Sequence, residues 1–356
     1  SGNASSLTLT TFVVDTTSPT AAITYDAAAP FKNGDAAVTI TATFNGPVLD
    51  SPVPTIAIAG SGIANVTSTN MTKVSTTVYT YSYAVPTGDG TGTVTVGTGT
   101  DAAGNIVTSV PTSGATFTVD NTAPTISAVT QVVTPSNDTT PSYVFTTNEA
   151  GTITTNITEG FSTSASAATG NNTVTFNTLG EGTYASKTVT VTDASGNASS
   201  LTLTTFVVDT TAPTGAITYS AASPYKQGAT ATVTATFTEA LTTTPKIAIS
   251  GVSSVAATNM TSTGSANIWT YAYTAPAGNG TDTFAFSVGT DAYGNVVTAA
   301  PTSGATVTVD NTSPTISAVT QVVTPSNDTT PSYVFTTNEA GTITTNITEG
   351  FSTSAS

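Results

Sequence analysis

Apolar and polar residues alternate along most of the chain. In Val38–Phe44, every second residue is apolar and Thr fills the positions between them. The same alternation recurs at residues 189–192 and 284–288. A period of two places apolar side chains on one face and Thr on the other, as in half-buried antiparallel strands. Helical spacing occurs nowhere for a useful length, and β-branched residues suit strands, so the pattern predicts an all-β protein.

Long stretches of the sequence occur twice. Residues 1–20 return as 195–214 with Ala212 in place of Ser18, and residues 120–166 return as 310–356 with Ser313 in place of Ala123. Such repeats indicate a chain of similar modules. The predicted parts are the last strand of a preceding short module at 1–14, a first long module at 15–119, a short module at 120–208, a second long module at 209–309, and the first half of a short module (the half-module) at 310–356.

Each module is predicted to be a sandwich of two sheets. Turn sequences such as Asn33-Gly34 separate the alternating runs. Many short strands in modules of about 90 to 105 residues favour an immunoglobulin-like antiparallel fold, and we expect such modules in an elongated array. For the short module we expect seven strands, near residues 125–133, 141–148, 151–158, 161–164, 172–178, 184–192 and 198–208.

The composition excludes several kinds of site and partner. The chain has no His and no Cys, 5 Lys and Arg residues against 20 Asp and Glu residues, and a formal net charge of −15. Disulfides, zinc clusters and Cys- or His-based nucleophiles are therefore excluded. So few cations cannot neutralise a phosphate backbone, and we expect no nucleic-acid partner. No apolar run reaches the roughly 18 residues of a membrane span. Without disulfides, burial must hold each module, and we expect Trp269, Tyr271 and Tyr273 to be part of a core.

Three short motifs carry a family resemblance. They are V-D-x-T-x-P-T at the module starts, T-D-A-x-G-N at residues 100–105, 192–197 and 290–295, and F-T-T-N-E-A-G at residues 145–151. With these motifs the chain resembles, over essentially its whole length, the bacterial immunoglobulin-like repeats of large cell-surface adhesins. The resemblance implies extracellular stalk modules, which often hold Ca²⁺ at their junctions.

Half of the carboxylates lie where modules are predicted to meet. In an immunoglobulin-like sandwich the entering chain shares one pole with the B–C and F–G turns, so each linker Asp should approach acids from both turns. Carboxylates beside carbonyl-rich turns suit Ca²⁺, which takes six to eight oxygen ligands, although Asp and Asn also serve turns by themselves. The predicted ligands are Asp15 and Asp101 in the first long module, Asp120, Glu149 and Asp193 in the short module, Asp209, Glu239 and Asp291 in the second long module, and Asp310 and Glu339 in the half-module.

The expected function is a non-enzymatic extracellular repeat array, the stalk or spacer of a surface adhesin, stiffened by Ca²⁺ at its junctions. Paired acids could also indicate glycoside hydrolysis, but acids at every junction argue for structure. The alternative is a self-assembling subunit of a filament, sheath or surface layer, because the edge strands carry little charge against lateral pairing. In one form of it, residues 1–14 complete the open half-module of another chain by strand donation.

The expected partners are neighbouring modules of the same or identical chains. A cell-surface or carbohydrate target would be bound through regions outside this sequence. Twelve Asn-x-Ser/Thr sequences, among them Asn65, Asn70, Asn156 and Asn259, only slightly exceed the number expected by chance, so glycosylation stays open.

Overall fold

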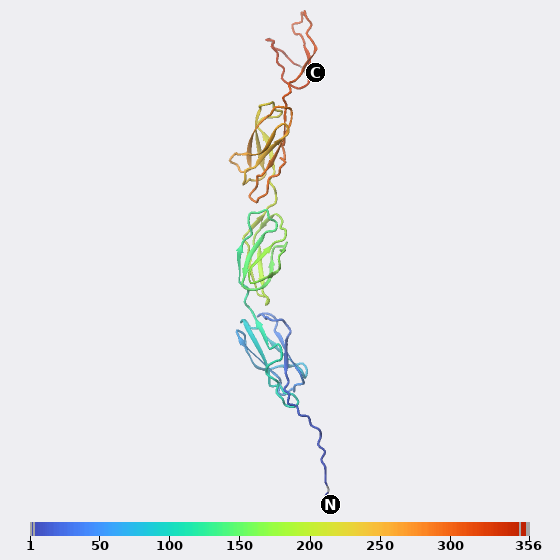
Figure 1. Cartoon of the computed structure of the whole chain (residues 1–356), viewed down its shortest axis with the longest axis vertical. Coiled ribbons are helices and arrows are strands. Elements are labelled where there is room, and N and C mark those ends of the chain that lie inside the picture. Colours follow the sequence, from blue (N-terminus) through green and yellow to red (C-terminus); the bar gives the residue numbers. More distant parts are fainter. Residues whose placement is uncertain (1, 3, 349, 354–356) are drawn as a thin grey trace. The chain divides into compact units, whose positions relative to one another are not determined.

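The computed structural model describes residues 2, 4–348 and 350–353. Contacts divide the chain into two compact units, one of Ser1–Thr134 with Asp138–Val208 and one of Pro135–Asn137 with Asp209–Ser356. Every regular element in the described residues is a strand, as the alternation predicts (Figure 1). The described residues accordingly contain no helix long and apolar enough to cross a membrane.

The first long module is a sandwich of two antiparallel four-stranded sheets, β1-β2-β6-β5 and β4-β3-β7-β8. Its strands are β1 (Ala21–Tyr25), β2 (Val38–Phe44), β3 (Thr55–Ser61), β4 (Val66–Asn70), β5 (Thr72–Lys73), β6 (Val78–Tyr83), β7 (Gly90–Gly97) and β8 (Thr116–Val119). Strand β2 coincides with the alternating run of the sequence. Its inward side chains, from Val38 to Phe44, are at most 3% exposed, whereas the Thr residues between them are partly or fully exposed.

The second long module repeats this arrangement with the sheets β18-β19-β23-β22 and β21-β20-β24-β25. Its strands are β18 (Gly215–Tyr219), β19 (Thr230–Phe237), β20 (Lys246–Ser250), β21 (Ser254–Asn259), β22 (Thr261–Ser262), β23 (Ile268–Thr274), β24 (Gly280–Ser287) and β25 (Thr306–Val309). Trp269 and Tyr273 of β23 are 8% and 2% exposed, and Tyr271 packs against the same core. The expected role of this aromatic stripe in the core is confirmed.

The short module has a three-stranded sheet, β13-β10-β9, a four-stranded sheet, β12-β11-β15-β16, and the pair β14-β17. The strands are β9 (Ile126–Thr130), β10 (Ser142–Thr147), β11 (Gly151–Thr155), β12 (Ser166–Ala167), β13 (Gly170–Thr175), β14 (Gly182–Tyr184), β15 (Thr188–Thr192), β16 (Ala198–Thr202) and β17 (Phe206–Val208). The antiparallel sandwich is therefore present, with more and shorter strands than the sequence predicts.

Three of the seven predicted strands of the short module differ from the structure. The prediction at 161–164 is wrong, because Phe161 forms only an isolated bridge with Phe176. The run 184–192 is divided into β14 and β15 at Ser186, whose φ is 54°. The run 198–208 is divided into β16 and β17, because the chain changes its partner from β15 to β14.

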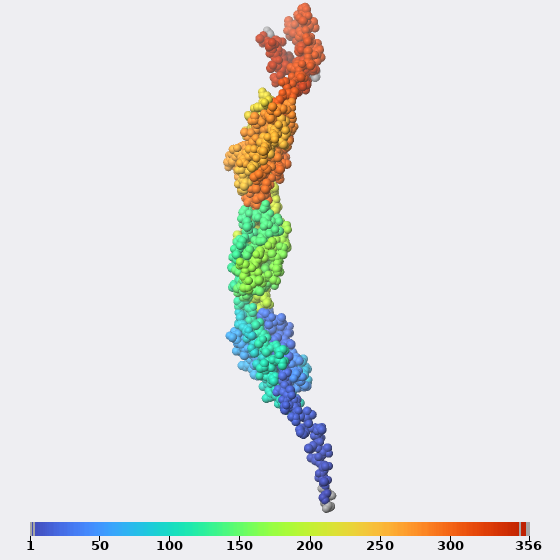
Figure 2. Space-filling view, in the orientation of Figure 1, coloured from blue at the N-terminus to red at the C-terminus, as the bar shows by residue number. Residues whose placement is uncertain are grey.

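Each module has its own cluster of buried apolar side chains. The clusters lie within residues 21–119, 132–208 and 217–309. In Figure 2 each of these ranges forms one block of neighbouring sequence colours. These cores support the turns described below.

Among the described residues, 4–14 and those after 309 belong to none of these clusters. Residues 4–14 form no strand, and their apolar side chains are exposed, for example Phe12 at 84%. The half-module contains one described pair, β26 (Ile316–Thr320) with β27 (Val334–Thr337). The copies of residues 4–14 in the short module form β16 and β17, which pair with β15 and β14.

Candidate metal centres

The F–G turn of the short module is organised around the carboxylate of Asp193. Its Oδ1 accepts hydrogen bonds from the backbone N–H groups of Ser195 at 2.8 Å and Asn197 at 2.9 Å. Its Oδ2 accepts one from Asn197 Nδ2 at 3.0 Å. Gly196 has a φ of 84°, a backbone conformation that glycine adopts without steric cost. The Asp-x-x-Gly-Asn sequence thus fixes the turn and leaves a lone pair of Asp193 Oδ2 for another partner.

The same turn holds the linker that enters the module. Asn197 Nδ2 also donates to the backbone carbonyl of Asp120 at 3.1 Å, and Ser195 Oγ donates to Asp120 Oδ2 at 3.1 Å. Asn197 is 4% exposed, so water competes little for these bonds. The linker carboxylate is therefore held beside the turn carboxylate.

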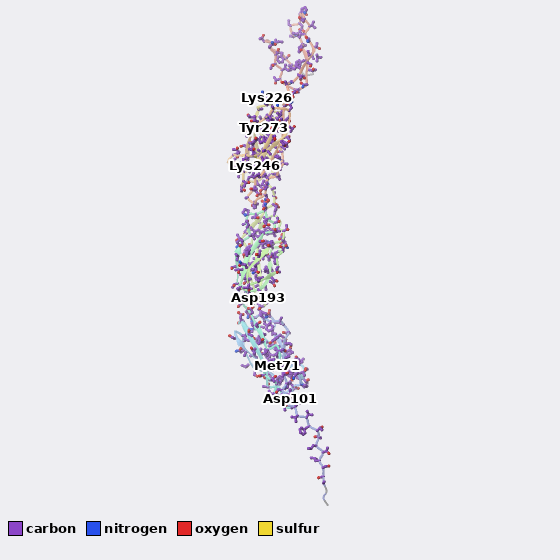
Figure 3. All side chains as sticks on the ribbon, viewed as in Figure 1. Met71, Asp101, Asp193, Lys226, Lys246 and Tyr273 are labelled. Atoms are coloured by element: carbon purple, nitrogen blue, oxygen red, sulfur yellow. The ribbon has the colours of Figure 1, made fainter. Side chains whose placement is uncertain are left out.

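Both long modules repeat this arrangement. In each, the turn carboxylate accepts two backbone N–H groups and the amide of the turn Asn. That amide also donates to the linker carbonyl, with Asn105 Nδ2 at 3.1 Å from Asp15 O and Asn295 Nδ2 at 2.9 Å from Asp209 O. Figure 3 labels two of the turn carboxylates, Asp101 and Asp193.

Two of the predicted ligand sets come together as three carboxylates, which we call the first and second trio. In each trio every residue offers one carboxylate oxygen within 4.8 Å of the others; the trios are Asp120, Glu149 and Asp193, and Asp209, Glu239 and Asp291. Glu149 and Glu239 follow β10 and β19, the strands that pair with the first strand of their modules. The topology of the sandwich therefore brings a third acid to the linker and the F–G turn.

The first long module has only two acids at this pole. Asn45 Oδ1 accepts the backbone N–H of Thr20 at 2.9 Å. Asn148 Oδ1 makes the matching bond in the short module at 2.7 Å, so Gly46 stands where the short module has Glu149. The linker and turn carboxylates of the first long module still line one recess together with this glycine.

The two predicted ligands of the half-module, Asp310 and Glu339, make separate local contacts. Asp310 Oδ1 accepts the backbone N–H of Thr312 at 2.9 Å, and Glu339 Oε1 accepts Asn338 Nδ2 at 3.2 Å. Among the described residues these two carboxylates belong to no group of three.

The trios concentrate negative charge. The ion pair between Lys73 and Asp50 involves no member of a trio. Two unit charges about 4 Å apart repel by about 4 kcal/mol at an effective dielectric constant of about 20. Lys32 does reach the turn of the first trio, where its Nζ donates to the carbonyl of Gly196 at 2.8 Å.

The residues fit a hard divalent cation better than a transition metal. Each trio offers only oxygen, which suits Ca²⁺. In the first trio, both lone pairs of Asp193 Oδ1 are engaged, but Asp193 Oδ2 and both Asp120 oxygens accept one bond each. With Glu149, the trio thus offers at least four usable oxygens, and water or backbone carbonyls would complete six to eight.

Hydrogen bonds of these turns also change the acidity of two carboxyls. The Asn105 side-chain amide, followed by backbone N–H groups of the turn, lowers the pKa of Asp101 from its ordinary value. The hydroxyl of Thr122 and then the N–H of Asn121 lower the pKa of Asp89 in the same way. A hydrogen bond to the ionised form favours that form, so both groups stay charged at neutral pH.

Sequence reasoning missed the role of the linker Asn at the exit of each long module. Asn121 Nδ2 donates to Gly88 O at 2.8 Å and Pro86 O at 3.2 Å, and Asn121 Oδ1 accepts the N–H of Asn33 at 2.7 Å. Asn311 makes the corresponding bonds in the second long module. The signal was present in the linkers, since those leaving the long modules read Asp-Asn-Thr and the one leaving the short module reads Asp-Thr-Thr.

No protein-family model matches the chain, and no curated protein matches it either. Similar solved structures include the I-band fragment I67–I69 of titin, which is 12% identical, covers 83% of this chain and 98% of its own, and has a TM-score of 0.37. Another is a tetra-tandem repeat from the extending region of a large adhesion protein, 19% identical, covering 90% of this chain and 87% of its own, with a TM-score of 0.26.

A further similar structure is the titin fragment A168–A170, which is 12% identical, covers 82% of this chain and 99% of its own, and has a TM-score of 0.30. The fold assignment rests on the sheets and registers of the chain itself. These define a tandem array of immunoglobulin-like antiparallel sandwiches, the fold that the resemblance to adhesin repeats implied.

Proposed function

We propose that the chain is a non-enzymatic extracellular spacer, part of the stalk of a surface adhesin, whose module junctions are stiffened by Ca²⁺. One observation carries this proposal. The same linker-to-turn hydrogen bond recurs at three module starts, and two of them add a third carboxylate with an oxygen within 4.8 Å of the others. Recurrence suits a structural role, because a spacer gains length from each repeat whereas catalysis needs one complete site.

Bound Ca²⁺ would offset the repulsion between the carboxylates of each trio. Without a cation, three carboxylates at one linker repel each other and favour opening of the turn from the linker. A bound divalent ion reverses that repulsion and joins the linker to two turns of the module. Its binding free energy adds to the stability of the folded state, by about 2.7 kcal/mol at a hundredfold excess over the dissociation constant.

A calcium titration of the whole chain tests the proposal. Thermal unfolding and small-angle scattering are measured with Ca²⁺ and with chelator, for the native chain and for the variant Glu149→Gln/Glu239→Gln. We expect Ca²⁺ to raise the Tm and the maximum dimension of the native chain and to change neither in the variant. Glu159→Gln is the matched control, since Glu159 is exposed and belongs to neither trio. Equal Tm and dimension with Ca²⁺ and chelator in the native chain contradict the calcium part.

A self-assembling subunit is the second candidate function. The observation that favours it is the lack of charged residues in the edge strands β4 and β21. Electron microscopy of the purified chain separates the two functions, since a spacer gives separate particles and a self-assembling subunit gives ordered polymers. In either case the nearest partners are modules of the same or identical chains, and a binding target would belong to other regions.

A further inference from the structure

Each long module closes one side of its sandwich and leaves the other side open. In the first long module, Ile23 donates its N–H to Ser113 O at 2.9 Å beside β1, and Phe31 donates to Thr118 O at 2.9 Å beside β8. Strands β4 and β5, on the other side, each pair with one neighbour. The second long module repeats both closures and leaves β21 and β22 open. In the short module, β13 is an edge strand with β10 as its neighbour.

These open edges carry almost no charge. An edge strand presents unpaired N–H and C=O groups, and soluble proteins usually protect it with Lys, Pro or inward-pointing charges. Strands β4, β13 and β21 contain no charged residue. In β5, Lys73 is already paired with Asp50. Some other protection is therefore required if the chain is to stay free of edge-to-edge pairing.

An Asn-x-Thr sequence begins in each of these three edge strands, and its Asn and Thr are exposed; in the long modules the Thr belongs to the next strand, β5 or β22. The Asn residues are Asn70 in β4, Asn171 in β13 and Asn259 in β21. In the long modules the middle residue is Met71 or Met260, and each is 4% exposed in its core (Figure 3 labels Met71). The buried Met anchors the strand and leaves the flanking Asn and Thr at the surface.

The side-chain amides of these three Asn residues are available for modification. Among the described side chains, those of Asn70, Asn171 and Asn259 make no hydrogen bond. Most other Asn-x-Ser/Thr sequences between residues 15 and 313 differ, because their Asn side chains are engaged: Asn65, Asn156, Asn197, Asn279 and Asn311. Asn137 is exposed too, but it lies in no strand and covers no edge. Sequence alone ranks these sites equally, whereas the structure separates them.

We propose that Asn70, Asn171 and Asn259 are acceptors for N-linked oligosaccharides, which cover the open edge of each module. Asn-x-Ser/Thr is the acceptor sequence for this modification in exported proteins. In the transfer, Asn Nδ2 forms a bond to C1 of the first sugar, and the C1–O bond to the pyrophosphate of a lipid-linked donor breaks. The pyrophosphate leaves with the proton lost from the amide. The transferase belongs to the exporting cell, and the inference rests on the proposed function for export alone.

Glycopeptide mass spectrometry of the chain isolated from its own cells tests the modification. We expect peptides containing Asn70, Asn171 and Asn259 to carry sugar masses and peptides containing Asn156 and Asn197 to be unmodified. Unmodified masses at all three edge sites in chain recovered from the cell surface overturn this inference and leave the spacer function intact. Unmodified chain found only inside the cell overturns both.

The covering role has its own test, by sedimentation velocity. We expect the isolated native chain to be monomeric and the variant Asn70→Gln/Asn171→Gln/Asn259→Gln to form dimers or larger species. Thr72→Ser/Thr173→Ser/Thr261→Ser is the matched control, since it keeps all three acceptor sequences. A triple Gln variant that sediments as a monomer overturns the covering role. So does a glycosylated native chain that still associates through these edges.

Discussion

The two long modules have the same strand order and differ at their entrances. Both hold the linker carbonyl with a turn Asn, at 3.1 Å in the first module and 2.9 Å in the second. The second adds Glu239, whereas the first has Gly46 at that position. Because the turn and its hydrogen bonds are intact without the third acid, the fold does not require that acid. Its presence in the second module therefore indicates a role other than building the turn.

The same modules also differ at one corner of the core. Asp282 lies opposite Val307 in the second module, and Gly92 lies opposite Phe117 in the first. A Cβ atom at Gly92 would lie 2.4 Å from the Phe117 ring, so that ring occupies the space that a side chain at this position needs. The sandwich thus fills one corner in two ways, with a carboxylate in one copy and an aromatic ring in the other.

In the second long module, both carboxylate oxygens of Asp282 accept hydrogen bonds. Asp282 is 0% exposed, and its carboxylate accepts bonds from Ser253 N and Ser253 Oγ at 2.5 Å each and from Tyr273 Oη at 2.7 Å. Burial, with the adjacent carboxylate as a second cause, raises the pKa of Tyr273. A buried carboxylate with three donors is stable in place, but each donor loses its partner if the carboxylate is removed.

Removing this carboxylate is expected to have the largest effect of all the changes considered. Asp282→Ala leaves three buried donors without an acceptor and creates a small void. We therefore expect the free energy of unfolding of the second long module to fall by about 3 to 4 kcal/mol. The chain contains 1 Trp, and Trp269 lies in the core of this module. Its fluorescence during urea unfolding therefore reports on this module alone.

The first long module supplies the control for that variant. Gly92 and Phe117 stand at the positions of Asp282 and Val307. The double change Asp282→Gly/Val307→Phe places the ring of the first module in this corner and is expected to recover part of the lost stability. If the double variant unfolds at the same urea concentration as Asp282→Ala, or if Asp282→Ala costs less than about 1 kcal/mol, the two corners are not equivalent.

The next largest effect is expected at the entrances, where one substitution gives the first long module the same three acids as the second. Gly46→Glu is sterically possible, because a Cβ there meets no atom within 4 Å and the residue is outside the left-handed region. We expect calorimetric titration to find one more Ca²⁺ site per chain in Gly46→Glu and one fewer in Glu239→Gln. By Trp269 fluorescence, Ca²⁺ at a hundredfold excess over its dissociation constant should stabilise the second module by about 2.7 kcal/mol in the native chain and in Gly46→Glu, but not in Glu239→Gln.

The reverse outcomes are equally informative. Unchanged stoichiometry in Gly46→Glu means that a third carboxylate is insufficient to create a site at this pole. Unchanged stoichiometry in Glu239→Gln, with Glu159→Gln as the charge control, means that the trio of the second module is not where Ca²⁺ binds.

The sequence predicted the class of fold because alternation and burial follow the same physics. Val38–Phe44 reads as a strand with one buried face and is one. The pole that gathers the acids was also predictable, since the topology of the sandwich brings the linker and two turns together. The structure places Asp120, Glu149 and Asp193 within reach of one another, while calcium at this site stays a prediction.

What the sequence did not predict depends on contacts with backbone groups and on side-chain volume. Asn121 donates to the backbone carbonyls of Gly88 and Pro86. Every residue has such a carbonyl, so the sequence does not show which ones will act as acceptors. The buried position of Asp282, in contrast, could be recognised in the sequence. In the alternating run Asp282, Phe284 and Phe286 a carboxylate takes an inward position, which signals a buried polar group. Its hydrogen-bond partners could not be deduced from the sequence, because Ser253 lies far from it in the chain, between β20 and β21.

The turn Asn residues should show a smaller difference between the two modules. Asn295 is 7% exposed, whereas Asn105 is only partly buried. We therefore expect Asn295→Ala to cost about 2 kcal/mol and Asn105→Ala about 1 kcal/mol, because an unpaired group costs more when water cannot reach it. Hydrogen exchange of the linker and turn amides, measured for each module in the full chain, compares the two. Equal loss of protection at both entrances would show that burial of the turn does not matter.

The smallest expected effect is the pH dependence of the first entrance. The Asn105 amide is the main cause that lowers the pKa of Asp101, so the folded state favours the ionised carboxylate. The stability contributed by this group is therefore present above the ordinary Asp pKa of about 3.9 and is lost as the pH falls through the lowered value. Carbon-13 NMR titration of the Asp101 carboxyl in native chain and in Asn105→Ala measures the shift directly. We expect the midpoint to rise toward the ordinary value in the variant; a midpoint that does not move would assign the lowered pKa to the backbone N–H groups of the turn alone, which Asn105→Ala leaves in place.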